Sequence, residues 1–161
     1  MSGLTLRPAR IEDSTFLARL CREALGYDAS PDAVAETLGR LSRQQDHTIL
    51  LAEWNGCPAG FIHTQRYEVL YVPAMMNVLG LAVSPGYRRR GIGHALLRAT
   101  EQDALARGIT AVRLASGAER TQAHQFYQSC GCLPHKQQLK FHKSLVPAGD
   151  SAGPSALRRE V

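Results

Sequence analysis

The amino-acid sequence predicts an α+β fold in which about four helices flank a central mixed, mostly antiparallel sheet. Three observations predict it. The length of 161 residues suits one domain, and contents of 44% hydrophobic and 20% charged residues are ordinary for a globular chain. Helix-like and strand-like patterns are interspersed along the chain. A hairpin signal at Asn55-Gly56 argues against a purely parallel sheet.

The N-terminal part predicts one strand and two helices. Residues 5–7 form a short strand, and Asp13 is placed to cap a first helix whose apolar residues recur at helical spacing. Ser30 and Pro31 have the N-cap and first-turn pattern of a second helix, which runs to about Arg43.

The middle of the chain predicts an antiparallel hairpin. Residues 48–54 and 59–65 favour strands, and Asn55-Gly56 is a typical two-residue turn between them. After the hairpin we expect an irregular continuation at 67–71, an interruption at Pro73 and a further strand at 76–83.

The C-terminal part predicts two more helices and ends in a tail. Residues 146–161 show no apolar periodicity, so we expect one domain over 1–145 followed by a tail over 146–161. The elements expected before the tail are a helix from Gly91 to about Arg107, a strand at 111–115, a helix at 121–129 and a last strand at 139–143.

Composition limits the classes of function. The net charge of +5 favours an anionic ligand without choosing among a nucleotide, a nucleic acid and a membrane surface. The four cysteines lack zinc-binding spacing, so no metal site is expected. The N-terminus carries no long apolar stretch, which predicts neither a signal peptide nor a membrane span and favours the cytoplasm.

The segment from Val83 to His94 carries the clearest chemical signal. A strand ends at Val83, and a run containing Gly91 and Gly93 then opens a helix, a geometry that presents unpaired backbone N–H groups to an anion. A dinucleotide-binding fold would need a third glycine where Leu96 stands, and the Gly-Lys-Ser/Thr of a P-loop is missing. A nucleic-acid site would need interleaved aromatic residues, which the run of arginines lacks.

Residues 81–97 resemble the acetyl-CoA signature of the GNAT superfamily of N-acetyltransferases. Arg88, Gly91 and Gly93 match its pattern Arg/Gln-x-x-Gly-x-Gly/Ala. A second family element, Ala-x-x-hydrophobic-Tyr, is matched by residues 123–127, with Gly131 behind it. The resemblance covers roughly residues 4–145 and implies acetyl-CoA as co-substrate, with no metal.

The resemblance also implies which residues bind the cofactor. The strand before the signature would pair with the pantetheine arm, and the backbone of the following loop would bind the pyrophosphate. Tyr127 matches a tyrosine near the cofactor sulfur that is often the acid protonating the departing thiolate; the alternative is that it only packs its helix against the sheet. The expected cofactor contacts are Leu81, Ala82, Val83, Arg88, Arg89, Arg90, Gly91, Ile92, Gly93, His94, Arg120 and Tyr127.

The sequence departs from the family pattern at two functional positions. Arg120 stands where many members have an asparagine that contacts the cofactor. Residues 77–80 contain no carboxylate, so the usual general base on that strand is missing. We expect Glu68 to be the base, working through a water molecule, with Tyr67 and His63 as alternatives; an acceptor that enters as a neutral amine would need none.

We expect the chain to transfer an acetyl group from acetyl-CoA to a primary amine of a small-molecule acceptor, by direct attack in a ternary complex. The sequence looks most like small bacterial amine and aminoalkylphosphonate-type acetyltransferases. The alternatives are a protein N-terminal or lysine acetyltransferase and a non-catalytic acyl-CoA-binding regulatory module. No nucleic acid or membrane partner is expected, and a homodimer is left open. Acceptor specificity should lie in residues 26–30 and 65–76.

Overall fold

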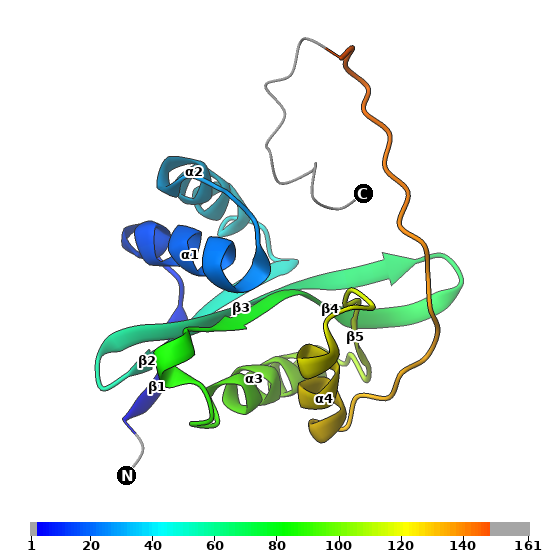
Figure 1. Cartoon of the computed structure of the whole chain (residues 1–161). Helices are drawn as coiled ribbons and strands as arrows, with labels where there is room; N and C mark the ends of the chain where they lie inside the picture. The colour runs from blue at the N-terminus through cyan, green and yellow to red at the C-terminus, as the bar shows by residue number, and fades with distance from the viewer. Residues whose placement is uncertain (1–2, 149–161) are drawn as a thin grey trace.

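A single five-stranded mixed sheet forms the centre of the molecule in the computed structural model, which describes residues 3–148 (Figure 1). The strands lie in chain order; the first four are antiparallel to their neighbours, and β5 runs parallel to β4. This arrangement confirms the predicted fold class. The strands are β1 (Leu4–Pro8), β2 (His47–Trp54), β3 (Cys57–Val69), β4 (Val72–Val83) and β5 (Val112–Leu114).

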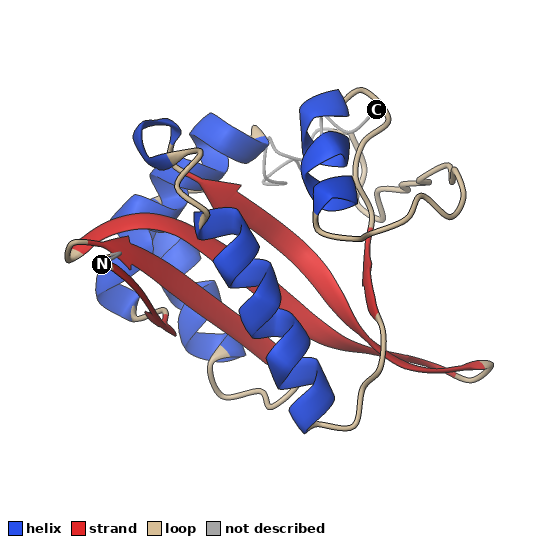
Figure 2. Ribbon diagram, turned by 90° about the horizontal axis from the view of Figure 1, so that it is seen from below, coloured by secondary structure: helices blue, strands red, loops and turns tan. Residues whose placement is uncertain are grey.

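Helices cover both faces of the sheet (Figures 1 and 2). On one face lie α1 (Ser14–Leu20), its continuation η2 (Cys21–Leu25) and α2 (Pro31–Leu41); on the other lie α3 (Ile92–Ala106) and α4 (Thr121–Ser129). Hydrophobic clusters hold these layers together, and a small one of Met76, Ala104 and Ile109 accompanies two larger ones. The first of the larger clusters contains Leu17, Leu20, Leu38, Leu51, Phe61 and Ala82, and the second Ala52, Ala59, Ile62, Val78, Ile92, Leu96 and Leu97.

Local chemistry sets the ends of several elements as predicted. Ser30 caps α2 by accepting a hydrogen bond from the Ala33 N–H at 3.1 Å. The β2–β3 turn has positive φ at both Asn55 (51°) and Gly56 (81°), as a type I′ hairpin turn requires. Gly108, with φ of 74°, follows the end of α3.

Pro73 does not interrupt the sheet, contrary to the sequence prediction. It lies inside β4, which begins at Val72, and the long β3–β4 hairpin projects beyond the helices (Figure 1). β5 pairs with β4 only from Met76 onward. The end of β4 that contains Pro73 is therefore an edge on that side, where a proline's missing N–H costs no ladder hydrogen bond.

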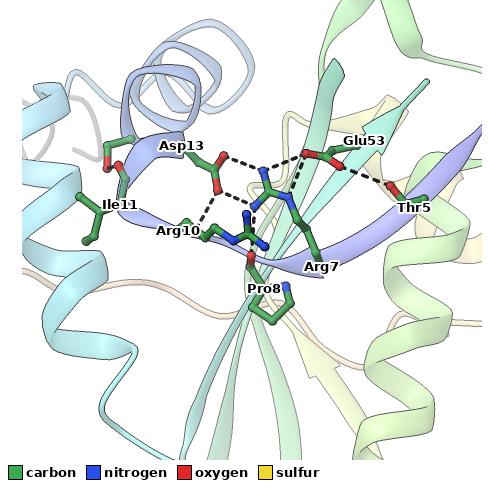
Figure 3. Close-up of polar contacts among 8 residues, drawn as sticks. Thr5, Arg7, Pro8, Arg10, Ile11, Asp13 and Glu53 are labelled. Carbon is green, nitrogen blue, oxygen red and sulfur yellow. Dashed lines mark hydrogen bonds and ion pairs between the residues drawn. The ribbon is translucent and has the colours of Figure 1, made fainter. Parts of the chain in front are cut away.

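Asp13 does not cap α1 with its side chain, although it stands at the N-cap position. Its carboxylate instead accepts two hydrogen bonds from the Arg7 guanidinium, each 2.8 Å long, and one from the Arg10 N–H at 2.7 Å (Figure 3). Arg7 also pairs with Glu53 of β2 at 2.9 Å. This Arg7 cluster (Arg7, Asp13 and Glu53) ties the start of α1 to two strands.

The predicted strand at 139–143 does not form. After α4 ends at Ser129, the described chain to residue 148 contains no further helix or strand. Leu139 and Phe141 are 82% and 89% exposed. Their apolar alternation resembles that of a strand, but a single strand is stable only where a sheet edge supplies its ladder partner, and this segment pairs with none of the described strands. The predicted boundary at residue 145 stays a prediction.

Candidate active site

The sheet opens between β4 and β5. The parallel ladder ends at the Val78–Leu114 pair, whereas β4 continues to Val83. Residues 79–83 therefore have one edge that no described strand covers. Leu79 adds a bulge at this point, because His63 pairs with Gly80 and Thr64 with Val78. The free edge offers backbone donors and acceptors to an extended ligand, and it includes the predicted pantetheine contacts Leu81, Ala82 and Val83.

Beyond this edge, the loop into α3 presents unpaired backbone donors. Arg89 and Gly91 have positive φ angles of 62° and 78°. The first N–H to bond back into the helix is that of Ala95, to the Gly91 carbonyl at 2.9 Å. The N–H groups of residues 89–94 have no acceptor among the described residues. Such a loop at a helix N-terminus is suited to a phosphate or pyrophosphate group.

The two signature glycines serve different purposes. A Cβ atom on Gly91 would meet no atom within 4 Å, so its surface is open to a ligand. A Cβ atom on Gly93 would lie 3.0 Å from the ring of Phe126. The missing side chain of Gly91 therefore leaves room for a ligand, whereas that of Gly93 leaves room for the Phe126 ring of α4.

The three arginines before α3 have no carboxylate partner within ion-pair distance among the described residues. Arg88 Nε donates to the Val83 carbonyl at 3.3 Å. The Arg90 guanidinium lies over the Trp54 ring, 5.2 Å from its centroid. Because all three are exposed, their charge adds positive potential to the free amides.

Tyr127 lies on α4, close to this loop. Its ring centroid is 5.2 Å from that of Phe126, which in turn packs against His94 at 5.1 Å. Burial raises the pKa of Tyr127, and the positive charge of Arg120 offsets part of that rise. The phenol is therefore protonated at neutral pH. Its hydroxyl has no hydrogen-bond partner among the described residues, so it is free to donate to a ligand.

The remaining predicted contacts lie around the same loop. The Ile92 side chain is 1% exposed and belongs to the core, so only its backbone faces the loop. The exposed His94 lies 3.3 Å from the Ser129 hydroxyl of α4. Arg120 directly precedes α4.

The three base candidates occupy separate environments on β3. The exposed Glu68 pairs with Arg66 at 3.1 Å, and the hydrogen bond from Arg66 lowers the pKa of its carboxyl. His63 lies 2.9 Å from His47, and burial, with the charge of His47 second, lowers the pKa of His63 to about 4. The Tyr67 ring lies 4.2 Å from the Arg113 guanidinium. No described contact joins any of the three to Tyr127.

The sequence reasoning missed Asn77 and Arg113. They form a cross-strand pair next to the point where β4 and β5 separate, and Arg113 Nη1 donates to Asn77 Oδ1 at 3.2 Å. The only signal in the sequence is a charged residue between the apolar Val112 and Leu114. Asn77 and Arg113 are far apart in the sequence, and only the register between β4 and β5 shows that they are neighbours.

A model of the acetyltransferase (GNAT) family matches residues 14–132. The chain belongs to this family, whose class is that of acetyl-CoA-dependent N-acetyltransferases. The free edge of β4, the unpaired amides and the open surface of Gly91 fit a coenzyme A molecule. No helix among the described residues is both long and apolar enough to cross a membrane.

A curated relative is the acetyl transferase GW6a of Oryza sativa subsp. japonica, 30% identical over 98 residues. That match covers 53% of this chain but only 23% of the relative, so the chain spans less than a quarter of its length.

Two solved structures share the fold. The structure of AAC(6')-Iy in complex with the bisubstrate analogue CoA-S-monomethyl-acetylneamine is 16% identical, with a TM-score of 0.77, over 88% of this chain and 98% of that one. The aminoglycoside acetyltransferase meta-AAC0020, from an uncultured soil metagenomic sample and in complex with trehalose, is 23% identical, with a TM-score of 0.75, over 89% and 97%.

Proposed function

We propose that this chain transfers an acetyl group from acetyl-CoA to the primary amine of a small-molecule acceptor, by direct attack in a ternary complex. One observation carries the proposal. The unpaired amides of residues 89–94 begin shortly after the free edge of β4 ends, so one extended ligand with a pyrophosphate can use both. The bisubstrate analogue bound by AAC(6')-Iy, which joins coenzyme A to an acetylneamine, supports a small-molecule acceptor.

The residues divide the work of binding. Residues 81–83 would hold the pantetheine arm through their backbone, and the amides from Arg88 to His94 would hold the pyrophosphate. Of these, the Arg88 N–H already makes a long bond of 3.4 Å to the Pro85 carbonyl, so the fully free donors begin at Arg89. The exposed arginines and Arg120 would add charge to the same ligand.

Tyr127 would act as the general acid. When bound, acetyl-CoA supplies a thioester carbon that the amine attacks, so that a C–N bond forms and the C–S bond breaks. Tyr127 holds a proton at neutral pH, as a phenol ordinarily does, and burial raises its pKa further; its free hydroxyl can give that proton to the leaving sulfur.

We propose Glu68 as the group that takes the proton from the amine through a water molecule, with Tyr67 and His63 as alternatives. The lowered pKa values of Glu68 and His63 make each a weaker base than usual. The test is the pH profile of kcat/KM for wild type and Glu68→Gln. An unchanged rate and an unchanged basic rise of the profile would exclude Glu68.

Two rival functions have distinct readouts. A protein N-terminal or lysine acetyltransferase would prefer a peptide panel over a panel of small amines. The absence of a carboxylate on residues 77–80 is the reason to test a regulatory module that binds acyl-CoA without turnover, which would release no free coenzyme A with any amine. The experiment is therefore an amine and peptide screen with thiol detection. A homodimer and a cytoplasmic location stay predictions.

A further inference from the structure

One cationic side chain, that of Arg113, lies beside the point where β4 and β5 separate. Phe61 packs with Leu17 and Leu38, which places it on the face covered by α1 and α2. Side chains alternate along β3, so Tyr67 points to the same face, and Asn77, which pairs with Gln65, does too. Arg113 contacts both Tyr67 and Asn77 and therefore lies on this face.

The Arg113 guanidinium is held in place but not neutralised. Asn77 Oδ1 accepts one hydrogen bond from Nη1, and the Tyr67 ring lies 4.2 Å from the guanidinium carbon. None of the ion pairs among the described residues includes Arg113. The half-buried cation thus keeps free donors with the geometry that binds carboxylate and phosphonate groups in a bidentate manner.

Arg113 lies close to the free edge of β4, where the thioester of a bound acetyl-CoA would lie. The Asn77–Arg113 pair is one residue before the last ladder pair, Val78–Leu114, and a strand rises about 3.3 Å per residue. The free edge of β4 begins directly after that pair. One small molecule could therefore reach with its anionic group to Arg113 and with its amine to a thioester bound along β4.

We propose that Arg113 binds the anionic group of the acceptor, and that the acceptor is a small amine bearing a carboxylate, phosphonate or phosphate group. Asn77 acts as a positioning residue, because its Oδ1 accepts a hydrogen bond from the guanidinium, and the Tyr67 ring packs against the same group. This proposal rests on the proposed function and names the acceptor class of that same site. Polycationic amines would be poor acceptors, since Arg113 would repel their ammonium groups.

The test compares matched amines by the rate of coenzyme A release. One pair is β-alanine and its amide; the other is 2-aminoethylphosphonate and ethanolamine; spermidine is the polycation. In each pair kcat/KM should be about tenfold or more higher for the anionic amine, the difference that a charge-assisted hydrogen bond supplies. Arg113→Gln should remove the preference while leaving acetyl-CoA affinity unchanged, and Arg113→Lys should keep part of it.

Arg66→Gln is the matched control, because Arg66 is an arginine of the adjoining hairpin that already has a carboxylate partner. It should leave the preference intact. Equal rates within both pairs, a preference for spermidine, or a preference that survives in Arg113→Gln would overturn the assignment of Arg113 while leaving acetyl transfer standing. The proposed function as well would be overturned if coenzyme A were released with peptides only, or if none of the acceptors tested caused its release.

Discussion

Two sets of arginines in this protein have opposite surroundings. Arg7 makes ion pairs with Asp13 and Glu53, whose side chains are 8% and 21% exposed. Arg88, Arg89 and Arg90, and on the other face Arg113, have no carboxylate partner among the described residues. A cation that the fold itself neutralises serves the architecture, whereas cations held beside free backbone donors are available to an anionic ligand.

The backbone shows the same contrast. Strands β1 to β3 pair along their length and carry the α1–α2 layer, which the Arg7 cluster anchors. The second half of β4 and the loop into α3 leave donors unpaired on one side. Hydrogen bonds that the fold leaves unmade at a surface cost little in water and are ready for a ligand.

The largest expected effect concerns Tyr127. Tyr127→Phe keeps the ring and removes the proton donor, so turnover should fall by about 10²- to 10⁴-fold, the usual contribution of general acid catalysis. Acetyl-CoA affinity should be unchanged. Steady-state kinetics would measure turnover and calorimetry would measure acetyl-CoA affinity. Tyr87→Phe, in the short helical turn before the loop into α3, is the control. Unchanged turnover, once chemistry is shown to limit the rate, would leave Tyr127 only a packing role.

The largest loss of folding stability is expected from Arg7→Met. The change leaves the buried Asp13 carboxylate without its main partner, which should cost about 3–5 kcal/mol in the free energy of unfolding. Urea unfolding would measure it. Arg90→Met, whose guanidinium has no ion pair, should cost about 1 kcal/mol or less. Similar losses in the two variants would refute the distinction between the groups.

The Arg7 cluster should also make stability depend on pH. The hydrogen bond from Arg7 lowers the pKa of Asp13 in the folded protein. Its contribution is therefore full above the unfolded pKa of about 3.9 and is lost as pH falls through the lower folded value. Urea midpoints measured from pH 6 to 2 should show a smaller acid decline for Asp13→Asn than for wild type. Parallel declines would contradict this origin.

A small effect is expected at Gly93. Gly93→Ala places a methyl group 3.0 Å from the Phe126 ring, and such overpacking should cost about 1 kcal/mol or slightly more. Phe126→Leu replaces the rigid ring with a smaller, more flexible side chain, so Gly93→Ala should cost much less in that variant. A double-mutant cycle measured by urea unfolding would reveal the difference. Additive losses would mean that the two residues do not meet.

Much of this could be read from the sequence because the signals were local. The Asn55-Gly56 turn, the Ser30 cap and the signature loop each depend on a few neighbouring residues, and each lies where it was predicted. The errors involved distant partners. Asp13 bonds to Arg7 instead of capping its helix, and Pro73 is tolerated because β5 begins to pair only further along β4.

The surroundings of Arg113 show the same limit. The Arg113 guanidinium is held by Asn77 and Tyr67, which lie far from it in the chain, so the sequence alone could not show its surroundings. The strand expected at 139–143 pairs with none of the described strands, and no local pattern could show whether a sheet edge was available to it. Sequence pattern thus predicted the loop that opens α3 but not the pairing of Arg113 with Asn77.

The measurement that tests the central claim most directly is thermal unfolding of the wild type with saturating acetyl-CoA. At about one hundred times its dissociation constant the ligand should add roughly 2.7 kcal/mol, a rise of roughly 5–10 °C in melting temperature. Acetyl-N-acetylcysteamine, a thioester without the pyrophosphate, should give no comparable rise, and Gly91→Trp, which obstructs the open surface of the loop, should abolish the response to acetyl-CoA. An unchanged wild-type melting temperature with acetyl-CoA would contradict the assignment of residues 89–94 as a cofactor site.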